Sequence, residues 1–351
     1  MADVEQRNIH PTTRIPVRSE SEQIRDQIIQ FFLQANGGFV STRDLSVRLG
    51  ISRTAVWKHI QLLESIGFSF TVQPRLGHRL EIVPNIILLP LLERHLSATC
   101  QLGREVKWLS EVDSTNAVAT RLAALGAPHG TVVVAARQTA GRGRRGRTWF
   151  SPVGGLWVSV LLRRPIPLQH AAELTLLSSF AMRRALMAET NLHIDVKWPN
   201  DLLYNGKKVC GILAEIRSEG ESLATAVLGM GVNTNLLATD FPTDLLKNAA
   251  TLSTARNQPV SHQKVLAQVL SQLDPWVEQL STGQSVFPQI AKEWRQSCIT
   301  LGQSVRVNTP AGLVTGQAIA VDDGGILYVR TQSGLMQKIH TGDVLFEEGQ
   351  E

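Results

Sequence analysis

The stretch from Gly141 to Trp149, Gly-Arg-Gly-Arg-Arg-Gly-Arg-Thr-Trp, constrains the fold of this chain more than any other. Four arginines and three glycines fall within its first seven residues. Glycine lets the backbone turn its N–H groups towards one point, and arginine offers a planar fork of donors that matches a phosphate or a carboxylate. An apolar core cannot accept that charge density, and the glycines disfavour a helix. The stretch therefore predicts either a loop that wraps an anionic ligand or a solvated, nonspecific RNA-binding tract.

The remainder of the chain has the composition of a folded protein. Its length of 351 residues allows roughly two to three domains, and 43% hydrophobic residues with 19% charged residues can form real cores. A formal net charge of +5 permits an anionic partner. The three cysteines lie far apart, without metal-ligand spacing, which fits a reducing compartment. Because no signal peptide and no apolar segment of membrane-spanning length is present, we expect a cytoplasmic protein with no membrane partner.

Residues 1–20 show no hydrophobic periodicity, and we expect a flexible tail there. Residues 21–84 predict a winged helix-turn-helix that binds DNA: helical spacing over 22–35 and 42–49, a turn at Gly50, and a third helix that Ser52 caps. Two strands, at 68–72 and 78–82, would form the wing. The residues expected to contact DNA are Arg53, Thr54, Trp57, Lys58 and Gln61 on the third helix and Arg75 and Arg79 in the wing. Seven basic residues against five acidic ones in 22–83 leave open a winged helix that makes only protein contacts.

The rest of the chain predicts a connector and two further domains. Residues 85–105 form the connector, with one short helix at 88–96. Residues 106–300 carry β-branched strand patterns around a long apolar helix at 171–189, which predicts an α/β catalytic domain with a mixed sheet. Residues 301–351 alternate in strand fashion between glycine turns, which predicts a small SH3-like β-barrel. The expected fold class is therefore α+β.

Three motifs together resemble the biotin–protein ligase family. They are the arginine/glycine stretch at 141–149, the pentapeptide Lys197-Trp198-Pro199-Asn200-Asp201, and Lys208 three residues before Gly211-Ile212-Leu213. With the winged helix in front, the chain is similar to the bifunctional members, which also repress the biotin operon. The resemblance covers the chain from about residue 22 to the end. It implies a two-step reaction, in which biotin and ATP form biotinyl-5′-adenylate and a carrier-protein lysine then takes the acyl group.

The resemblance also implies roles for individual residues. A carboxylate that attacks a phosphate brings two anions together, so a cation must neutralise both, and Lys208 is the candidate. Arg144 matches the arginine that holds the adenylate. The residues expected to bind biotin or its adenylate are Ser114, Thr115, Asn116, Gln138, Arg142, Gly143, Arg144, Trp149, Lys208 and Asn233. Trp149 would either stack on adenine or act as an apolar latch. Asp201 would either bind Mg²⁺ or orient Lys197, so the metal ligands stay open.

The implied ligands are ATP with Mg²⁺ and biotin, which is both substrate and precursor of the corepressor. The implied partners are a biotin carrier domain of a carboxylase, operator DNA, and a second copy of the chain in a ligand-promoted homodimer. One departure concerns the C-terminal segment, where Glu347 stands at a position that often holds an arginine in the family. Three alternatives remain: a ligase whose winged helix has no regulatory role, a lipoate ligase, and a purely nucleic-acid-binding protein.

Overall fold

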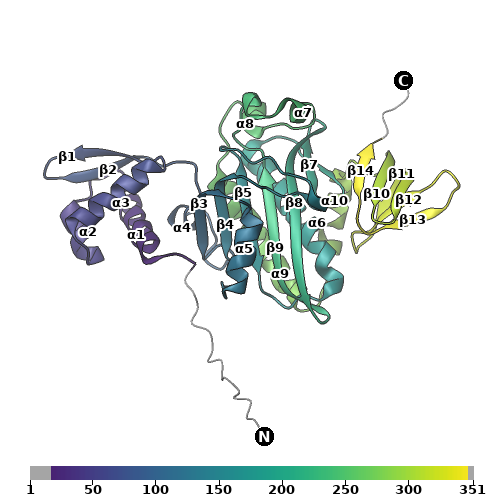
Figure 1. Cartoon of the computed structure of the whole chain (residues 1–351), viewed down its shortest axis with the longest axis horizontal. Helices are drawn as coiled ribbons and strands as arrows, with labels where there is room; N and C mark the ends of the chain where they lie inside the picture. Colours follow the sequence, from purple (N-terminus) through teal and green to yellow (C-terminus); the bar gives the residue numbers. More distant parts are fainter. Residues whose placement is uncertain (1–16, 347–351) are drawn as a thin grey trace, which may run out of the picture.

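The structure is a computed structural model that describes residues 17–346. A winged helix-turn-helix lies at one end, a larger α/β domain in the middle, and a small antiparallel sheet at the other end (Figure 1). The predicted fold class is confirmed. Within the described range, no helix is long and apolar enough to cross a membrane.

The N-terminal unit follows the predicted helix-turn-helix and wing. Its elements are α1 (Glu20–Gln34), α2 (Thr42–Leu49), α3 (Arg53–Ser65), β1 (Ser69–Gln73) and β2 (Gly77–Ile82). Serine side chains cap all three helices at Ser19, Ser41 and Ser52, and Gly50 ends α2 in the left-handed conformation, with φ of 67°. Apolar side chains of the three helices form a core of their own, which fixes the outward face of α3.

Part of the expected N-terminal tail is packed against the protein. Val17 is buried in an apolar cluster beside the catalytic domain, and Arg18 pairs with Asp26 at 2.6 Å and with Glu105 at 3.1 Å. Lys107 and Glu22 form a further ion pair at 2.8 Å. These contacts fasten α1 to the first strand of the central sheet. Residues 1–16, the rest of the expected tail, lie outside the described residues.

The central domain is built on a seven-stranded mixed sheet of order β3-β4-β5-β9-β8-β7-β6, in which only β3 and β4 run parallel. The strands are β3 (Val106–Val112), β4 (Val132–Gln138), β5 (Leu156–Leu162), β6 (Asp195–Lys197), β7 (Asp201–Tyr204), β8 (Lys207–Glu219) and β9 (Ser222–Val232). The short β7 pairs with β8 only from Lys207 to Gly211, so the second half of β8 pairs with β9 alone.

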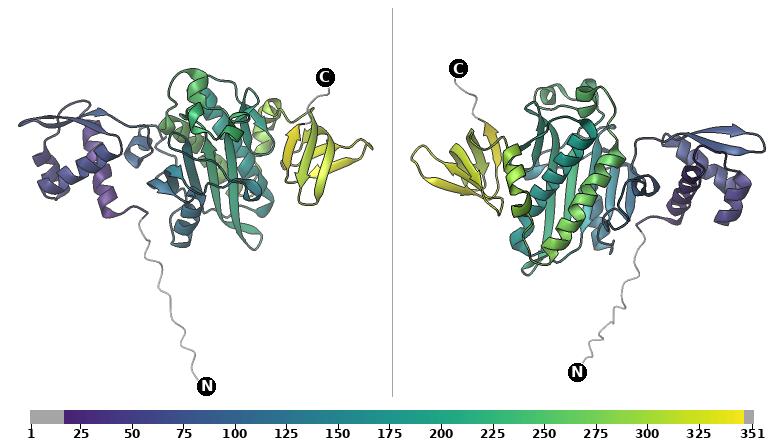
Figure 2. Two further views of the ribbon diagram at one scale, coloured as in Figure 1. Left: turned by 45° about the horizontal axis from the view of Figure 1, so that its top comes forward. Right: turned by 180° about the vertical axis from the view of Figure 1, so that it is seen from behind.

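Helices cover both faces of this sheet. The long helices α6 (Ala171–Thr190) and α9 (His262–Ser281) lie together across one face, and α5 (Thr115–Ala124) covers the other (Figure 2). The shorter helices are α4 (Leu89–Glu93) in the connector, α7 (Thr243–Leu246), α8 (Leu252–Arg256) and α10 (Phe287–Ser297). The connector helix is shorter than predicted, since Arg94 follows Glu93 as the C-cap.

The C-terminal unit is a five-stranded antiparallel sheet of order β13-β12-β11-β10-β14. Its strands are β10 (Ser304–Thr309), β11 (Gly312–Val321), β12 (Leu327–Arg330), β13 (Met336–Ile339) and β14 (Asp343–Phe346). Its topology is compatible with the expected SH3-like barrel, although in residues 17–346 the outer strands β13 and β14 do not pair to close it. The departure at Glu347 lies outside the described residues.

Candidate active site

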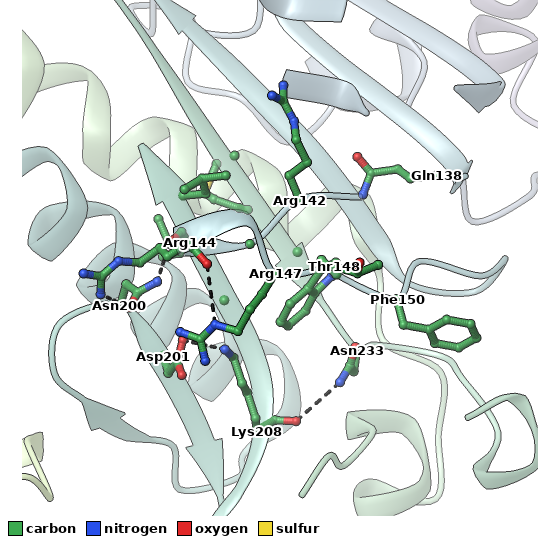
Figure 3. A pocket seen from close by; sticks show the side chains of 18 of the residues that line it. Gln138, Arg142, Arg144, Arg147, Thr148, Phe150, Asn200, Asp201, Lys208 and Asn233 are labelled. Carbon is green, nitrogen blue, oxygen red and sulfur yellow. Dashed lines mark hydrogen bonds and ion pairs between the residues drawn. The ribbon is translucent and has the colours of Figure 1, made fainter. Parts of the chain in front are cut away.

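A single cavity of about 250 Å³ gathers residues that are far apart in the sequence. It opens between α5, the arginine/glycine loop at 141–149, and strands β8 and β9 (Figure 3). All ten residues expected to bind biotin or its adenylate line it: Ser114, Thr115, Asn116, Gln138, Arg142, Gly143, Arg144, Trp149, Lys208 and Asn233.

Lys208 stands at one side of this cavity. Its ammonium group lies 2.7 Å from the Asp201 carboxylate and 5.1 Å from the centre of the Trp149 ring. The backbone around it is fixed, because its N–H donates to the carbonyl of Asn248 and its carbonyl accepts from Ala250 N–H and from Asn233 Nδ2. Lys208 is therefore a positioned cation with one side facing the cavity. The sequence left Asp201 either as a Mg²⁺ ligand or as the partner of Lys197. In this structure its carboxylate forms an ion pair with Lys208 instead.

Trp149 forms part of the floor. Its indole lies against Gly211 and Gly231, which are paired across β8 and β9, and a side chain at either glycine would run into the ring. This close approach explains why two neighbouring strands carry glycine at these positions. The indole N–H is buried and has no hydrogen-bond acceptor among the described residues.

The opposite wall consists of small polar side chains at the start of α5. Thr115 and Asn116 are buried, and Ser159 of β5 lies within hydrogen-bond distance of both, 2.8 Å from Thr115 Oγ1 and 2.6 Å from Asn116 Oδ1. The Gln138 carboxamide oxygen accepts from the Thr115 N–H, and its nitrogen donates to Ser151. Ser114 is also buried in this wall. Neutral donors and acceptors in fixed positions suit a neutral polar ring such as a cyclic urea.

The arginine/glycine loop is held on one side by the C-terminal sheet. Arg144 donates to Asn200 Oδ1 at 3.0 Å and to Thr341 Oγ1 at 2.6 Å, and Arg147 forms an ion pair with Asp343. Arg145, in the left-handed region with φ of 56°, donates to the carbonyl of Asn308. Arg142 instead pairs with Glu215 of β8, so all four guanidiniums contact groups outside the loop, and Arg142, Arg144 and Arg147 line the cavity.

A further lysine lies close to this cluster. Burial lowers the pKa of Lys197 from its usual value, and the neighbouring cations Lys208 and Arg147 lower it further, against the opposing effect of Asp201. Its ammonium group lies 5.0 Å from the centre of the Phe346 ring in β14. The pentapeptide therefore contributes a second, desolvated cation near Lys208.

Several residues at this site were not predicted from the sequence. Ser159, Glu215 and Thr341 contact predicted residues directly, and the acid Asp343 lines the cavity and pairs with Arg147 of the loop. For these four residues the sequence offered one signal, which was Ser159 within the apolar run of β5. A hydroxyl buried in a strand needs a hydrogen-bond partner, so its position indicates a polar contact there. The other three contacts depend on how the sheets and the loop are placed in space.

The residues expected to contact DNA form a separate surface on the N-terminal unit. Arg53, Thr54, Trp57, Lys58 and Gln61 are exposed on α3, as is Arg75 at the wing tip. Arg79 is half-buried: its guanidinium stacks over Phe39 and pairs with Glu81 at 2.6 Å. Its contribution to that surface is thus smaller than its position in the sequence indicates.

Three family models match the chain, one on each unit. The model of the biotin/lipoate A/B protein ligase family matches residues 108–233, that of an HTH domain matches 25–79, and that of the biotin protein ligase C-terminal domain matches 300–346. The first match contains the whole arginine/glycine loop, the pentapeptide and Lys208.

Relatives and solved structures agree with these matches. The proteins called bifunctional ligase/repressor BirA from Bacillus spizizenii and Bacillus subtilis are each 36% identical over 322 residues, which is 92% of this chain and 98% of each relative. The solved biotin protein ligase from Aquifex aeolicus in complex with biotin and ATP is 29% identical, with a TM-score of 0.58, over 70% of this chain and 100% of that structure. The chain therefore belongs to the biotin/lipoate A/B protein ligase family and is similar over nearly its whole length to the bifunctional ligase/repressors.

Proposed function

We propose that this protein joins biotin to a lysine of a biotin carrier domain of a carboxylase, with ATP, through biotinyl-5′-adenylate. The single observation that carries the proposal is the position of Lys208, a fixed cation that lines one cavity together with a wall of neutral polar side chains and a loop of four arginines. The relatives that bear ligase names and the solved ligase with biotin and ATP support the same assignment.

In the first step a biotin carboxylate oxygen attacks the α-phosphorus of ATP, and pyrophosphate leaves. Two anions have to approach each other, and the Lys208 ammonium group is placed to neutralise charge on both. At the cavity mouth, Arg144 and Arg147 would hold phosphate oxygens through paired N–H donors. In the second step the carrier lysine amine attacks the acyl carbon, an amide forms, and AMP leaves.

The biotin ring would lie against the wall formed by Ser114, Thr115, Asn116 and Gln138. Hydroxyl and amide groups can donate to the urea oxygen and accept from its N–H groups without the desolvation cost of a charge. The adenine would lie near Trp149 and Asn233, where an aromatic face and a buried carboxamide line the same part of the cavity.

Mg²⁺ would enter with the nucleotide. It commonly takes one or two carboxylates together with phosphate oxygens and waters. Asp201 and Asp343 are the carboxylates among the described residues that line the cavity, and each pairs with a cation that a phosphate could also take. Among residues 17–346, no group of three or more His, Cys, Asp or Glu side chains could hold a metal ion alone. The residues present thus fit a metal that is bound mainly through the nucleotide.

We further propose that the winged helix binds operator DNA and represses biotin-synthesis genes when the adenylate is bound. The exposed face of α3 carries Arg53 and Lys58 with the hydrogen-bonding residues Thr54 and Gln61. Two copies of the chain would pair along the edge of β8 at residues 213–219, where β9 is the one strand among the described residues that pairs with β8. A two-fold dimer presents two recognition helices to a palindromic site.

The ligase activity is tested by incubation with biotin, ATP, Mg²⁺ and a biotin carrier domain, followed by streptavidin detection of the carrier. We expect labelling that depends on all four components, and lipoate in large excess should not compete. Carrier that stays unlabelled, or labelling that lipoate suppresses as well as unlabelled biotin does, would overturn the proposal. The second outcome would favour a lipoate ligase.

A further inference from the structure

Glu215 contacts two parts of the site at once. It lies in the half of β8 that pairs only with β9, and its two carboxylate oxygens have different partners. Oε2 accepts a hydrogen bond from Asn116 Nδ2 at 2.8 Å, and Oε1 forms an ion pair with Arg142 at 3.4 Å. Asn116 belongs to the polar wall, and Arg142 is the first arginine of the loop. One carboxylate therefore joins the wall to the loop.

The contact with Glu215 determines which way the Asn116 amide points. A carboxylate can only accept, so the amide nitrogen must face Glu215, while the amide oxygen takes the Ser159 hydroxyl at 2.6 Å. The same amide packs against the backbone of Gly229, so that a side chain at position 229 would run into it. Asn116 is therefore held in one orientation, with its oxygen towards Ser159 and the cavity.

The contact with Arg142 holds the side of the loop that the C-terminal sheet does not reach. Arg144, Arg145 and Arg147 contact Asn200 and the C-terminal sheet, whereas the Arg142 side chain points away from Lys208 and Asp201 (Figure 3). Its ion pair with Glu215 is the contact that ties the start of the loop to β8.

We propose that Glu215 is a positioning residue that couples the biotin wall to closure of the arginine/glycine loop. This inference rests on the proposed ligase function and deepens it. Through its hydrogen bond with Asn116, the Glu215 carboxylate fixes a side chain of the biotin-binding wall. Through its ion pair with Arg142, it holds the loop closed over the adenylate. The Arg142–Glu215 pair is partly exposed, so its effect on ligand retention should be about three- to fivefold, as for other exposed ion pairs.

Glu215→Gln separates the two contacts. The glutamine oxygen can still accept from Asn116, but the uncharged side chain cannot pair with Arg142. We expect biotin affinity within about twofold of the wild type, and release of preloaded biotinyl-5′-adenylate about three- to fivefold faster. Glu278→Gln, which removes a partly exposed ion pair with Arg164 away from the cavity and from β8, is the matched control and should release adenylate at the wild-type rate.

A double-mutant cycle distinguishes coupling from general weakening of the structure. Arg142→Gln should speed adenylate release by the same factor as Glu215→Gln, and the double variant should be no faster than either single variant. Biotin should also protect the wild-type loop from trypsin, and this protection should be lost in Glu215→Gln although biotin still binds. A merely structural role would lower biotin binding and protection together.

Two results would overturn the role of Glu215: unchanged adenylate release in Glu215→Gln, or effects in the double variant that add. A drop in biotin affinity as large as that of Asn116→Ala would also overturn it, because the carboxylate would then serve the wall alone. Wild-type protein that binds neither biotin nor synthetic adenylate would instead overturn the proposed function, and with it this inference.

Discussion

Lys208 is placed by its backbone neighbours as much as by its ion pair. Hydrogen bonds to Asn248, Ala250 and Asn233 fix its strand, and Asp201 holds its ammonium group at 2.7 Å. A cation held before the substrates arrive needs no rearrangement during the reaction, which is the condition for efficient electrostatic stabilisation of a transition state. The neighbouring Lys207 is exposed and begins β8, so it offers a comparison within the same strand.

Lys208→Ala should abolish adenylate formation and leave the fold intact. Removal of the cation between two reacting anions should cost about 3 kcal/mol or more, which corresponds to a rate at least about a hundredfold lower. The rate of pyrophosphate release measures this step, and circular dichroism checks the fold. Lys207→Ala is the control and should turn over normally. Near-normal pyrophosphate release from Lys208→Ala would show that another group supplies the charge.

Helix α9 begins at a buried histidine that connects three segments. His262 accepts or donates at Nε2 with Thr234, 2.7 Å away, and with Asn235, while its backbone N–H donates to Asn85 of the connector. Thr234 and Asn235 directly follow Asn233 of the cavity. Complete burial lowers the pKa of His262 to about 4. The neutral imidazole is therefore part of the packing between the cavity and the connector.

Because the pKa of His262 is lowered in the folded protein, we expect the protein to lose stability in acid. The unfolded chain binds a proton at this residue below its ordinary pKa of about 6.5, whereas the folded protein does not until about pH 4. The neutral His262 therefore makes its full contribution to the free energy of unfolding above pH 6.5. That contribution falls by roughly 3 kcal/mol as the pH drops from 6.5 to 4.

Urea unfolding across this pH range measures the effect. His262→Gln should be less stable at pH 7 and should show a shallower decline between pH 6.5 and 4. His193→Gln removes an exposed histidine and should keep the wild-type decline. If the decline is equally steep in His262→Gln, the acid sensitivity comes from other groups.

At the scale of helices, strands and loops, local patterns in the sequence predicted most of the secondary structure. Gly50 and Ser52 marked the turn and the third helix of the N-terminal unit, and the glycine-rich motif marked the loop, because these features act over a few residues. The pocket membership of Asn233 and Gln138 came from the family resemblance. The contacts of Glu215, Thr341 and Asp343 could not be predicted, since each depends on strand register or on the placement of the C-terminal sheet.

At the scale of the whole molecule, hydrogen bonds and ion pairs link the N-terminal and C-terminal units to the residues around the central cavity. The C-terminal sheet holds the arginine/glycine loop through Thr341 and Asp343. At the other end, Asn85 of the connector bonds to Val260 and His262, which lie one hydrogen bond from the segment that follows Asn233. Residues that line the cavity are therefore linked to segments that lead to both smaller units. The net charge of the winged helix is small, so one copy would make few phosphate contacts and a dimer would have to supply the affinity for DNA.

We propose that this chain uses its own reaction intermediate to control its binding to DNA. The most direct test is the affinity for a palindromic fragment upstream of biotin-synthesis genes, measured with the apo, biotin-bound and adenylate-bound protein across a salt series. We predict the tightest binding in the adenylate-bound state. Arg53→Ala and Lys58→Ala should weaken it without affecting ligation, and each should lower the salt slope by about one if it removes a phosphate contact. Equal affinity in all three states would contradict the account and leave a ligase whose winged helix does not respond to biotin.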